Sequence, residues 1–213
     1  MLRFEQPRPE DALACEWAYF LDAAAQTQPP AGNNWVAATS VVARLFSAAQ
    51  CERIVALGEA LGLARGHMTR PGHSPRRCQF AWMRRDPATA WIYDRIAEAV
   101  REVNRNYGFE LVGMMDPLQF TRYDGATHDE IGWHLDCGEG PNTTRKLSLS
   151  VQLSDPEAYD GGDLEFLAMP ASSFTRHRGA AILFPALLAH RVTPVARGTR
   201  HALVAFWNGP PFR

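Results

Sequence analysis

A histidine and a carboxylate stand two residues apart in the run Ile-Gly-Trp-His-Leu-Asp, residues 131–136. Alternate side chains of a β-strand project from the same face, so His134 and Asp136 would form two corners of a metal site. His190, in a later strand-like run, is the best candidate for a third ligand. Two histidines and one carboxylate leave coordination positions open, which suits non-haem Fe(II). The H-x-D pattern alone is weak, because a surface histidine with ordinary hydrogen bonds produces it as well.

An arginine in the last strand-like run gives the metal site a second component. Residues 200–207 alternate, which places Arg200 on one face with Ala202, Val204 and Phe206. A charge that faces a barrel interior is costly unless a partner neutralises it, and a dicarboxylate held by the guanidinium fork is such a partner. We expect a turn at residues 195–199, and Arg200 shares a face with His190 only if this turn has three residues or a bulge. The alternative is a surface arginine in a hairpin.

Residues 146–153 show the cleanest two-residue period in the chain. One face is apolar, and the other carries Ser148, Ser150 and Gln152. In a soluble sheet the polar face normally meets solvent. If helices cover the apolar face instead, the serines and Gln152 line a polar pocket beside the metal site, and this is the arrangement that we expect.

The elements that position these residues change in kind along the chain. Helical patterns cover residues 11–26, a segment that begins after a Ser47 cap and includes Ile54, Leu57 and Leu61, and residues 88–107. We expect a long exposed loop at 65–78. Short strands follow after residue 110, at 117–123, 131–136, 146–153, 163–168, 180–184, 189–195 and 200–207. This order predicts an α+β protein in which helices pack on one face of a β sandwich or barrel.

Composition restricts the class of protein. The 213 residues are 46% hydrophobic, which excludes a disordered chain, and the formal net charge of −1 argues against nucleic acid as a partner. The cysteines are scattered (Cys15, Cys51, Cys78, Cys137), as expected for free thiols in a reducing compartment. We see no signal peptide and no membrane-spanning run, and we expect a cytoplasmic protein.

Several motifs follow one another in an order typical of one enzyme family. The sequence resembles the Fe(II)/2-oxoglutarate-dependent dioxygenases, in the prolyl-4-hydroxylase-like branch, over about residues 39–207. The match is sharpest over 119–207. The motifs are Tyr123-Asp124-Gly125, His134-x-Asp136, Gly161-Gly162-Asp163-Leu164, and His190-Arg191-Val192-Thr193-Pro194-Val195-x-x-Gly198-x-Arg200.

The resemblance implies a fold and a division of the chain. It implies a double-stranded β-helix (jelly-roll) core with supporting N-terminal helices, in one domain over 1–213. Within it we expect an N-terminal extension at 1–38, helical support at 39–109 and the jelly-roll core at 110–207.

The resemblance also implies a cofactor and roles for the site residues. Fe(II) would be held by His134, Asp136 and His190, and the far carboxylate of 2-oxoglutarate by Arg200. The co-substrate pocket would include Tyr123, Ser148, Ser150 and Gln152. The reaction would use O2, with ascorbate as an additional reductant, and would release succinate and CO2.

The substrate would be an amino acid, a peptidyl residue such as proline, or a natural-product intermediate, oxidised at a C–H bond. Ile131, Gly132 and Trp133 differ from an aromatic residue that many relatives carry just before H-x-D. These differences fall where substrate would enter and argue against peptidyl proline.

Three alternatives remain open from the sequence. A cupin-like jelly roll could hold zinc with the same three ligands, which leaves Arg200 without a role. A protein-interaction domain could retain a decayed site. The basic residues of the expected loop and its neighbourhood could form a solvated face or contact an acidic substrate; they are Arg70, Arg76, Arg77, Arg84 and Arg85. Cys137 would point away from His134 on a strand, so we reject it as a catalytic thiol.

Overall fold

The computed structural model describes residues 39–68, 75–138, 140–167, 169 and 176–212, and the backbone of residues 19–20. Its helices are α1 (Ala48–Glu59) and α2 (Ala90–Tyr107), with short 3₁₀ turns at Gly125–Thr127, Gly140–Thr144 and Pro156–Ala158. The first strands are β1 (Tyr19–Phe20), β2 (Ser40–Val42), β3 (Ala64–Met68), β4 (Arg76–Met83) and β5 (Gly113–Met114). The later ones are β6 (Leu118–Asp124), β7 (Glu130–His134), β8 (Arg145–Gln152), β9 (Tyr159–Gly161), β10 (Leu164–Phe166), β11 (Ala181–Pro185), β12 (His190–Val192) and β13 (Val195–Asn208).

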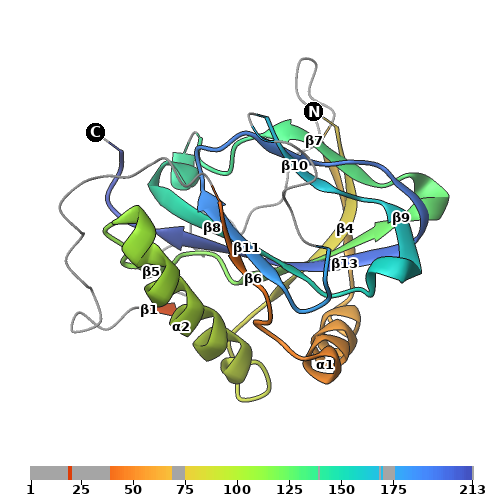
Figure 1. Ribbon diagram of the computed structural model, residues 1–213, viewed down its shortest axis with the longest axis horizontal. Coiled ribbons are helices and arrows are strands. Elements are labelled where there is room, and N and C mark those ends of the chain that lie inside the picture. The colour runs from red at the N-terminus through yellow and green to blue at the C-terminus, as the bar shows by residue number, and fades with distance from the viewer. Residues whose placement is uncertain are drawn as a thin grey trace.

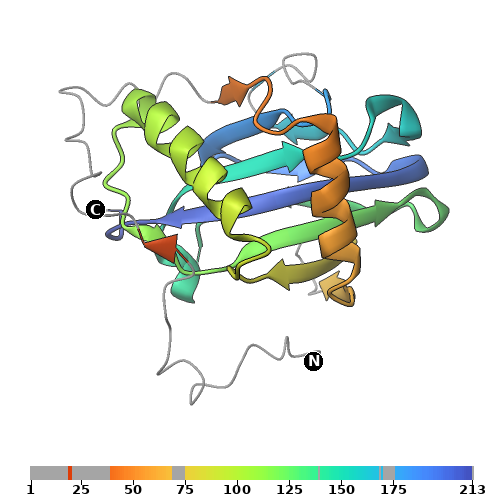
Figure 2. The same cartoon turned by 90° about the horizontal axis from the view of Figure 1, so that it is seen from below.

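The strands form one antiparallel sheet that curls on itself, with α1 and α2 on one side (Figure 1). Its order is β10-β12-β7-β4-β6-β13-β8-β11-β2. Both helices lie across the same face of the sheet (Figure 2). The α+β layout predicted from the sequence is therefore correct. No helix in the described part of the chain is long and apolar enough to cross a bilayer.

The two helices begin and end for local reasons. Ser47 caps α1 in a reciprocal box: its Oγ accepts from the backbone N–H of Gln50, and Gln50 Oε1 accepts from that of Ser47. Helix α2 ends at Gly108, whose φ of 65° is readily adopted only by glycine. The prediction for 88–107 is thus confirmed to within two residues. Leu61 lies beyond the end of α1 and is exposed, so its predicted place on the apolar face is wrong.

The apolar core consists of two clusters, one on each face of the sheet. The larger one joins the helices to the outer face of the sheet and includes the apolar side chains of β8: Leu147, Leu149 and Val151, with Leu153 just beyond. The smaller one fills the inner face; it contains Cys78, Tyr123, Ile131, Tyr159, Leu164, Phe166, Ile182, Phe184, Val192 and Val195. The alternate residues of β8 therefore face inward, as the two-residue period predicted.

Three local predictions need correction. The expected loop at 65–78 is largely β3 and β4, which pair with each other from Ala64↔Phe80 to Met68↔Arg76. The turn expected at 195–199 is absent, because β13 runs from Val195 to Asn208, but its register against β9 shifts between Val195 and Arg197, which agrees with the bulge considered as the alternative to a turn. Residues 19–20 form a strand that pairs with β5, so the helix predicted at 11–26 is wrong there, and the rest of that prediction lies outside the described residues.

The segment predicted as helical support also contributes to the sheet. Residues 39–109 contain α1 and α2, and also β2, β3 and β4. Strand β4 is central to the curled sheet because it pairs with β6 on one side and with β7 on the other. The cause of the error is that a Gly- and Pro-rich stretch separates the two strands of a hairpin.

Gly58 on α1 allows the helix to lie close to β6. A Cβ at this position would lie 2.4 Å from the ring of Phe120, which is fully buried. We expect Gly58→Ala to destabilise the protein by about 1–3 kcal/mol, because overpacking exceeds the gain in helix propensity of about 1 kcal/mol. Chemical denaturation measures the change. Ala56→Gly is the control, because Ala56 is exposed on the same helix. This variant should lose only the stability that comes from helix propensity, about 1 kcal/mol. A Gly58→Ala protein as stable as the wild type would contradict this close packing.

Candidate metal and co-substrate site

The three predicted metal ligands lie together on the inner face of the sheet. His134 Nε2 is 3.6 Å from Asp136 Oδ1, and His190 Nε2 is 3.5 Å from Asp136 Oδ2. All three ligand atoms lie within 4.8 Å of one another. Bonds of about 2.0–2.2 Å, which such nitrogens and oxygens make to metals, require only a small closing of this group.

A bulge in β7 turns His134 toward this position. His190 pairs with His134 and Val192 with Ile131, so β7 has one more residue than β12 between these pairs. The extra residue puts Ile131 and His134 on the same inner face. Asp136 lies past the end of β7, where its backbone N–H donates to the carbonyl of Ala186 at 3.0 Å. The prediction that His134 and Asp136 meet is thus correct, but strand alternation is not the cause.

Hydrogen bonds orient both imidazoles. His134 Nδ1 lies 2.9 Å from the carbonyl oxygen of Gly132, and His190 Nδ1 lies 2.8 Å from that of Leu188. A carbonyl can only accept, so each Nδ1 carries the proton and each Nε2 keeps a lone pair directed at Asp136. Outer hydrogen bonds of this kind are characteristic of metal-binding histidines.

The three ligand side chains differ in their exposure to solvent. The side chains of His190 and Asp136 are 6% and 9% exposed, whereas that of His134 is 30% exposed. The rings of Phe184 and Phe166 pack against His190, with centroids 4.7 and 5.9 Å away. Solvent, and hence a substrate, reaches the group from the side of His134.

Burial and charge act in opposite directions on Asp136. Burial alone would raise the pKa of its carboxyl, but the His190 charge, with His134 and the Ser148 hydrogen bond, outweighs burial and holds this pKa well below its usual range. Burial lowers the pKa of His190, against the charge of Asp136. The carboxylate is therefore ionised and the His190 imidazole neutral at neutral pH, which are the forms that bind a divalent cation.

Ser148 supports the carboxylate directly, because its Oγ donates to Asp136 Oδ2 at 2.7 Å. We expect Ser148→Ala to lower metal affinity about 10–100-fold, the usual effect of losing such a partner. Titration with Fe(II) under anaerobic conditions measures it. Ser154→Ala is the matched control, since Ser154 Oγ bonds to the backbone of Thr199, away from the metal group. Equal metal affinity in the two variants would contradict a role for Ser148.

The predicted arginine is buried without a partner. Arg200 is 1% exposed, and Nε, Nη1 and Nη2 make no hydrogen bond to any residue that the structure describes. Its guanidinium carbon lies 5.1 Å from the ring centre of Tyr123, the residue it pairs with across β6 and β13. Burial raises the pKa of Tyr123 to about 12, against the charges of Arg200 and Arg76. An uncompensated charge in this position indicates an anionic ligand.

Two further features belong to this end of the inner face. A Cβ on Gly162 would lie 2.9 Å from Cδ of Arg200, so the glycine pair of the sequence motif makes room for the arginine side chain. Ser150 and Gln152 are buried on β8, and Oε1 of Gln152 has no hydrogen-bond partner in the described part of the chain. The structure thus brings every predicted site residue onto the inner face.

Sequence reasoning missed Arg145, and it placed Arg76 in an exposed loop instead of on the inner face of the sheet. Arg145 donates to the backbone carbonyl of Asp136 at 3.4 Å and to Asp116 Oδ2 at 2.6 Å, which ties the ligand-bearing bend to β8. Arg76 lies on the inner face of β4. The alternation Arg76, Cys78, Phe80 was the available signal, and the loop prediction obscured it.

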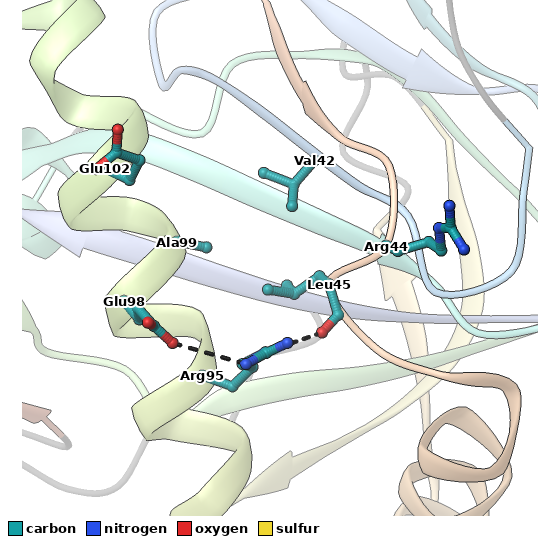
Figure 3. A pocket seen from close by; sticks show the side chains of 7 residues that line it. All are labelled: Val42, Arg44, Leu45, Arg95, Glu98, Ala99 and Glu102. Atoms are coloured by element: carbon teal, nitrogen blue, oxygen red, sulfur yellow. Dashed lines mark hydrogen bonds and ion pairs between the residues drawn. The ribbon is translucent and has the colours of Figure 1, made fainter.

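A hollow on the helical side does not belong to this site. It lies between α2 and the segment that joins β2 to α1 (Figure 3). Its charges are engaged locally, since Arg95 donates to the carbonyl of Leu45 at 3.2 Å and lies 3.8 Å from Glu98. No predicted site residue is among those that line it: Val42, Arg44, Leu45, Arg95, Glu98, Ala99 and Glu102.

A curled antiparallel sheet with two histidines, a carboxylate and a buried arginine on its inner face defines a jelly-roll oxygenase scaffold. Residues 118–208 match the family model of the 2OG-Fe(II) oxygenase superfamily, and this match, together with relatives named hydroxylase, supports a 2OG-Fe(II) oxygenase similar to the prolyl-4-hydroxylases. The predicted family and fold are both confirmed.

Relatives of known name support this assignment. The chain is 38% identical over 103 residues to a PKHD-type hydroxylase of Nitrobacter winogradskyi, which covers 43% of this chain and 42% of the relative. It is 30% identical over 139 residues to a PKHD-type hydroxylase of Acinetobacter baylyi, which covers 57% and 56%. The chain thus spans about half the length of the curated relatives it matches.

Solved structures show the same fold. A prolyl-4-hydroxylase of Pseudomonas putida aligns with a TM-score of 0.61 at 18% identity, over 80% of this chain and 92% of that one. A viral collagen prolyl hydroxylase of Paramecium bursaria Chlorella virus-1 aligns with a TM-score of 0.62 at 17% identity, over 81% and 96%.

Proposed function

We propose that the protein is an Fe(II)- and 2-oxoglutarate-dependent dioxygenase that hydroxylates a C–H bond of its substrate and releases succinate and CO2. The observation that carries the proposal is Arg200: a buried guanidinium that makes no hydrogen bond to any described residue, on the same inner face as two histidines and a carboxylate. A redox-inert metal protein would have no use for that charge. A dicarboxylate neutralises it through a bidentate contact.

The residues divide into two groups by their chemistry. His134, Asp136 and His190 hold the metal, through Nε2 of each histidine and the ionised carboxylate. Arg200 binds the far carboxylate of 2-oxoglutarate, beside the Tyr123 ring and the polar side chains of β8. Bound iron supplies O2 activation coupled to decarboxylation of the keto acid.

The protein's own part is to position and to shield. The Ser148 hydroxyl donates to the Asp136 carboxylate, which favours its ionised form and fixes its orientation. Phe166 and Phe184 exclude water from the buried side of the metal group. The open side at His134 admits the substrate, so oxidation takes place where the site meets solvent.

The substrate class is the less specific part of the proposal. Relatives named PKHD-type hydroxylase and prolyl-4-hydroxylase favour a peptide or an amino-acid-like small molecule. The formal net charge of −1 argues against nucleic acid as a partner, and we propose ascorbate as a reductant for the iron in assays. A cytoplasmic location stays a prediction.

Anaerobic addition of Fe(II) and 2-oxoglutarate to the apo-protein tests the proposal. The expected result is a visible metal-to-ligand charge-transfer band that saturates with 2-oxoglutarate. The same titration with succinate, which lacks the keto group, gives no band. Folded protein that binds Fe(II) and shows no band with 2-oxoglutarate would overturn the proposal and favour a metal-binding jelly roll of the cupin type.

A further inference from the structure

A second arginine points into the curled sheet, from β4. Cys78 on this strand belongs to the inner cluster, whereas Met83 belongs to the helical cluster on the other face. Side chains alternate along a strand, so Arg76 shares the inner face with Cys78 and Phe80. Its neighbour Arg77 is on the outer face, exposed and paired with Glu130.

The surroundings of Arg76 do not neutralise its charge. Nη2 donates to Gln119 Oε1 at 3.2 Å, and the guanidinium carbon lies 5.7 Å from the ring centre of Phe80. Burial raises the pKa of the Cys78 thiol, and Arg76 opposes this by charge and by a hydrogen bond. These three partners are neutral. Nε of Arg76 is buried and makes no hydrogen bond to the residues that the structure describes.

The guanidinium groups of Arg76 and Arg200 have different neighbours on β6. The guanidinium of Arg200 lies over Tyr123, its direct partner across β6 and β13. That of Arg76 lies at Gln119, which pairs with Val204. Arg200 and Val204 are four residues apart on β13, about 13 Å of strand. The Gln119 contact of Arg76 is thus distinct from the Tyr123 contact of Arg200, although both charges act on the Tyr123 hydroxyl.

The Gln119 residue that Arg76 contacts lies on the metal side of the Arg200–Tyr123 pair. Val204 pairs with Ser150, and the next inward residue on β13, Phe206, pairs with Ser148, which bonds to Asp136. The Gln119 position is therefore between the co-substrate anchor and the metal. Trp82, which pairs with Gln119, is 39% exposed and meets Phe80 edge to face, so an aromatic surface borders the arginine.

We propose that Arg76 binds a carboxylate of the primary substrate, and that the substrate is an amino acid or a C-terminal residue with a free carboxylate. The inference rests on the proposed function and deepens it. Arg76 presents a charged group to the carboxylate, Gln119 orients that group, and Phe80 and Trp82 contact the apolar part of the substrate. An amide or an internal peptide residue has no charge to offer at this position.

The test compares carboxylates with their amides. The anaerobic Fe(II)–2-oxoglutarate complex is titrated calorimetrically with the twenty L-amino acids, free and N-acetylated, and with the primary amide of each. The proteins are wild type, Arg76→Met and Arg77→Met, the last as matched control. We expect at least one carboxylate to bind about tenfold or more tightly than its amide in wild type and in Arg77→Met. In Arg76→Met this preference is lost.

Each other outcome overturns the inference in a recognisable way. Equal affinity for acid and amide, a preference retained in Arg76→Met, or no binding of any probe excludes carboxylate recognition by Arg76. A tenfold weaker binding of 2-oxoglutarate to Arg76→Met would assign Arg76 to the co-substrate instead. Absence of the charge-transfer band in wild type overturns the proposed function first, and this inference with it.

Discussion

Arg200→Met is expected to weaken 2-oxoglutarate binding on the order of 100-fold or more, while the apo-protein becomes more stable. Loss of one partner of a desolvated, charge-assisted pair costs about 2–5 kcal/mol, and each 1.4 kcal/mol is tenfold in affinity. The opposite effect on the apo-protein follows from the absence of a described partner for the guanidinium. Methionine has a similar length and no charge, so the substitution removes a buried charge at little cost in packing. We expect the free energy of unfolding to rise by about 1–3 kcal/mol.

Two measurements and one control make this prediction decisive. Titration of the charge-transfer band under anaerobic conditions gives the 2-oxoglutarate affinity, and chemical denaturation without ligand gives the stability. Arg197→Met is the control on the same strand, since Arg197 is exposed and pairs with Asp160 at 2.6 Å. It should change neither quantity by much. Wild-type affinity in Arg200→Met would show that another group anchors the co-substrate.

The inward direction of Ser148 and Arg200 could be predicted from residue types and order, because both residues lie in strands with clear alternation. On β8 the leucines face the helices and Ser148 faces Asp136, as a two-residue period requires. Arg200 faces inward for the same reason. These positions depend on local rules that a sequence contains.

The sequence predictions that were wrong or incomplete concern features that depend on pairing between segments far apart in the sequence. The bulge that turns His134 inward is a mismatch between β7 and β12, and no residue type marks it. Asp136 is placed by a hydrogen bond to Ala186, which lies far along the chain. Strand β13 continues through 195–199 because β9 and β6 pair with it there, although Gly198 suggests a turn.

The inward direction of Arg76 could not be predicted because it also depends on pairing between distant strands. A stretch rich in glycine, proline and arginine is typical of an exposed loop, and only the pairing of β4 with β6 shows that its second half is a central strand. The expected basic cluster separates as a result: Arg76 faces inward, Arg77 faces outward, and Arg85 pairs with Asp94 beyond the other end of β4.

Asp136→Ala is expected to abolish turnover and to lower Fe(II) affinity by more than the 10–100-fold that follows loss of an outer hydrogen bond. The variant removes one of three ligands, and it also removes the anion that lies within 3.6 Å of both imidazoles. Without that charge, only two neutral ligands hold a divalent cation in this buried position. Two neutral ligands offset less of the free-energy cost of dehydrating the cation. Anaerobic Fe(II) titration and succinate formation measure the two effects.

The control for this variant is Asp160→Ala, because Asp160 is exposed and pairs only with Arg197 among the residues that the structure describes. It should bind Fe(II) and turn over like the wild type. Circular dichroism and denaturation separate loss of metal from loss of fold, since Asp136→Ala leaves the Ser148 hydroxyl without its acceptor, at a cost of about 1–3 kcal/mol. A folded Asp136→Ala protein with wild-type Fe(II) affinity would show that the metal binds elsewhere. Loss of affinity in both Ala variants would instead indicate a general effect of charge. Loss in Asp136→Ala alone assigns the carboxylate to the metal and makes the group with His134 and His190 the site where oxygen chemistry takes place.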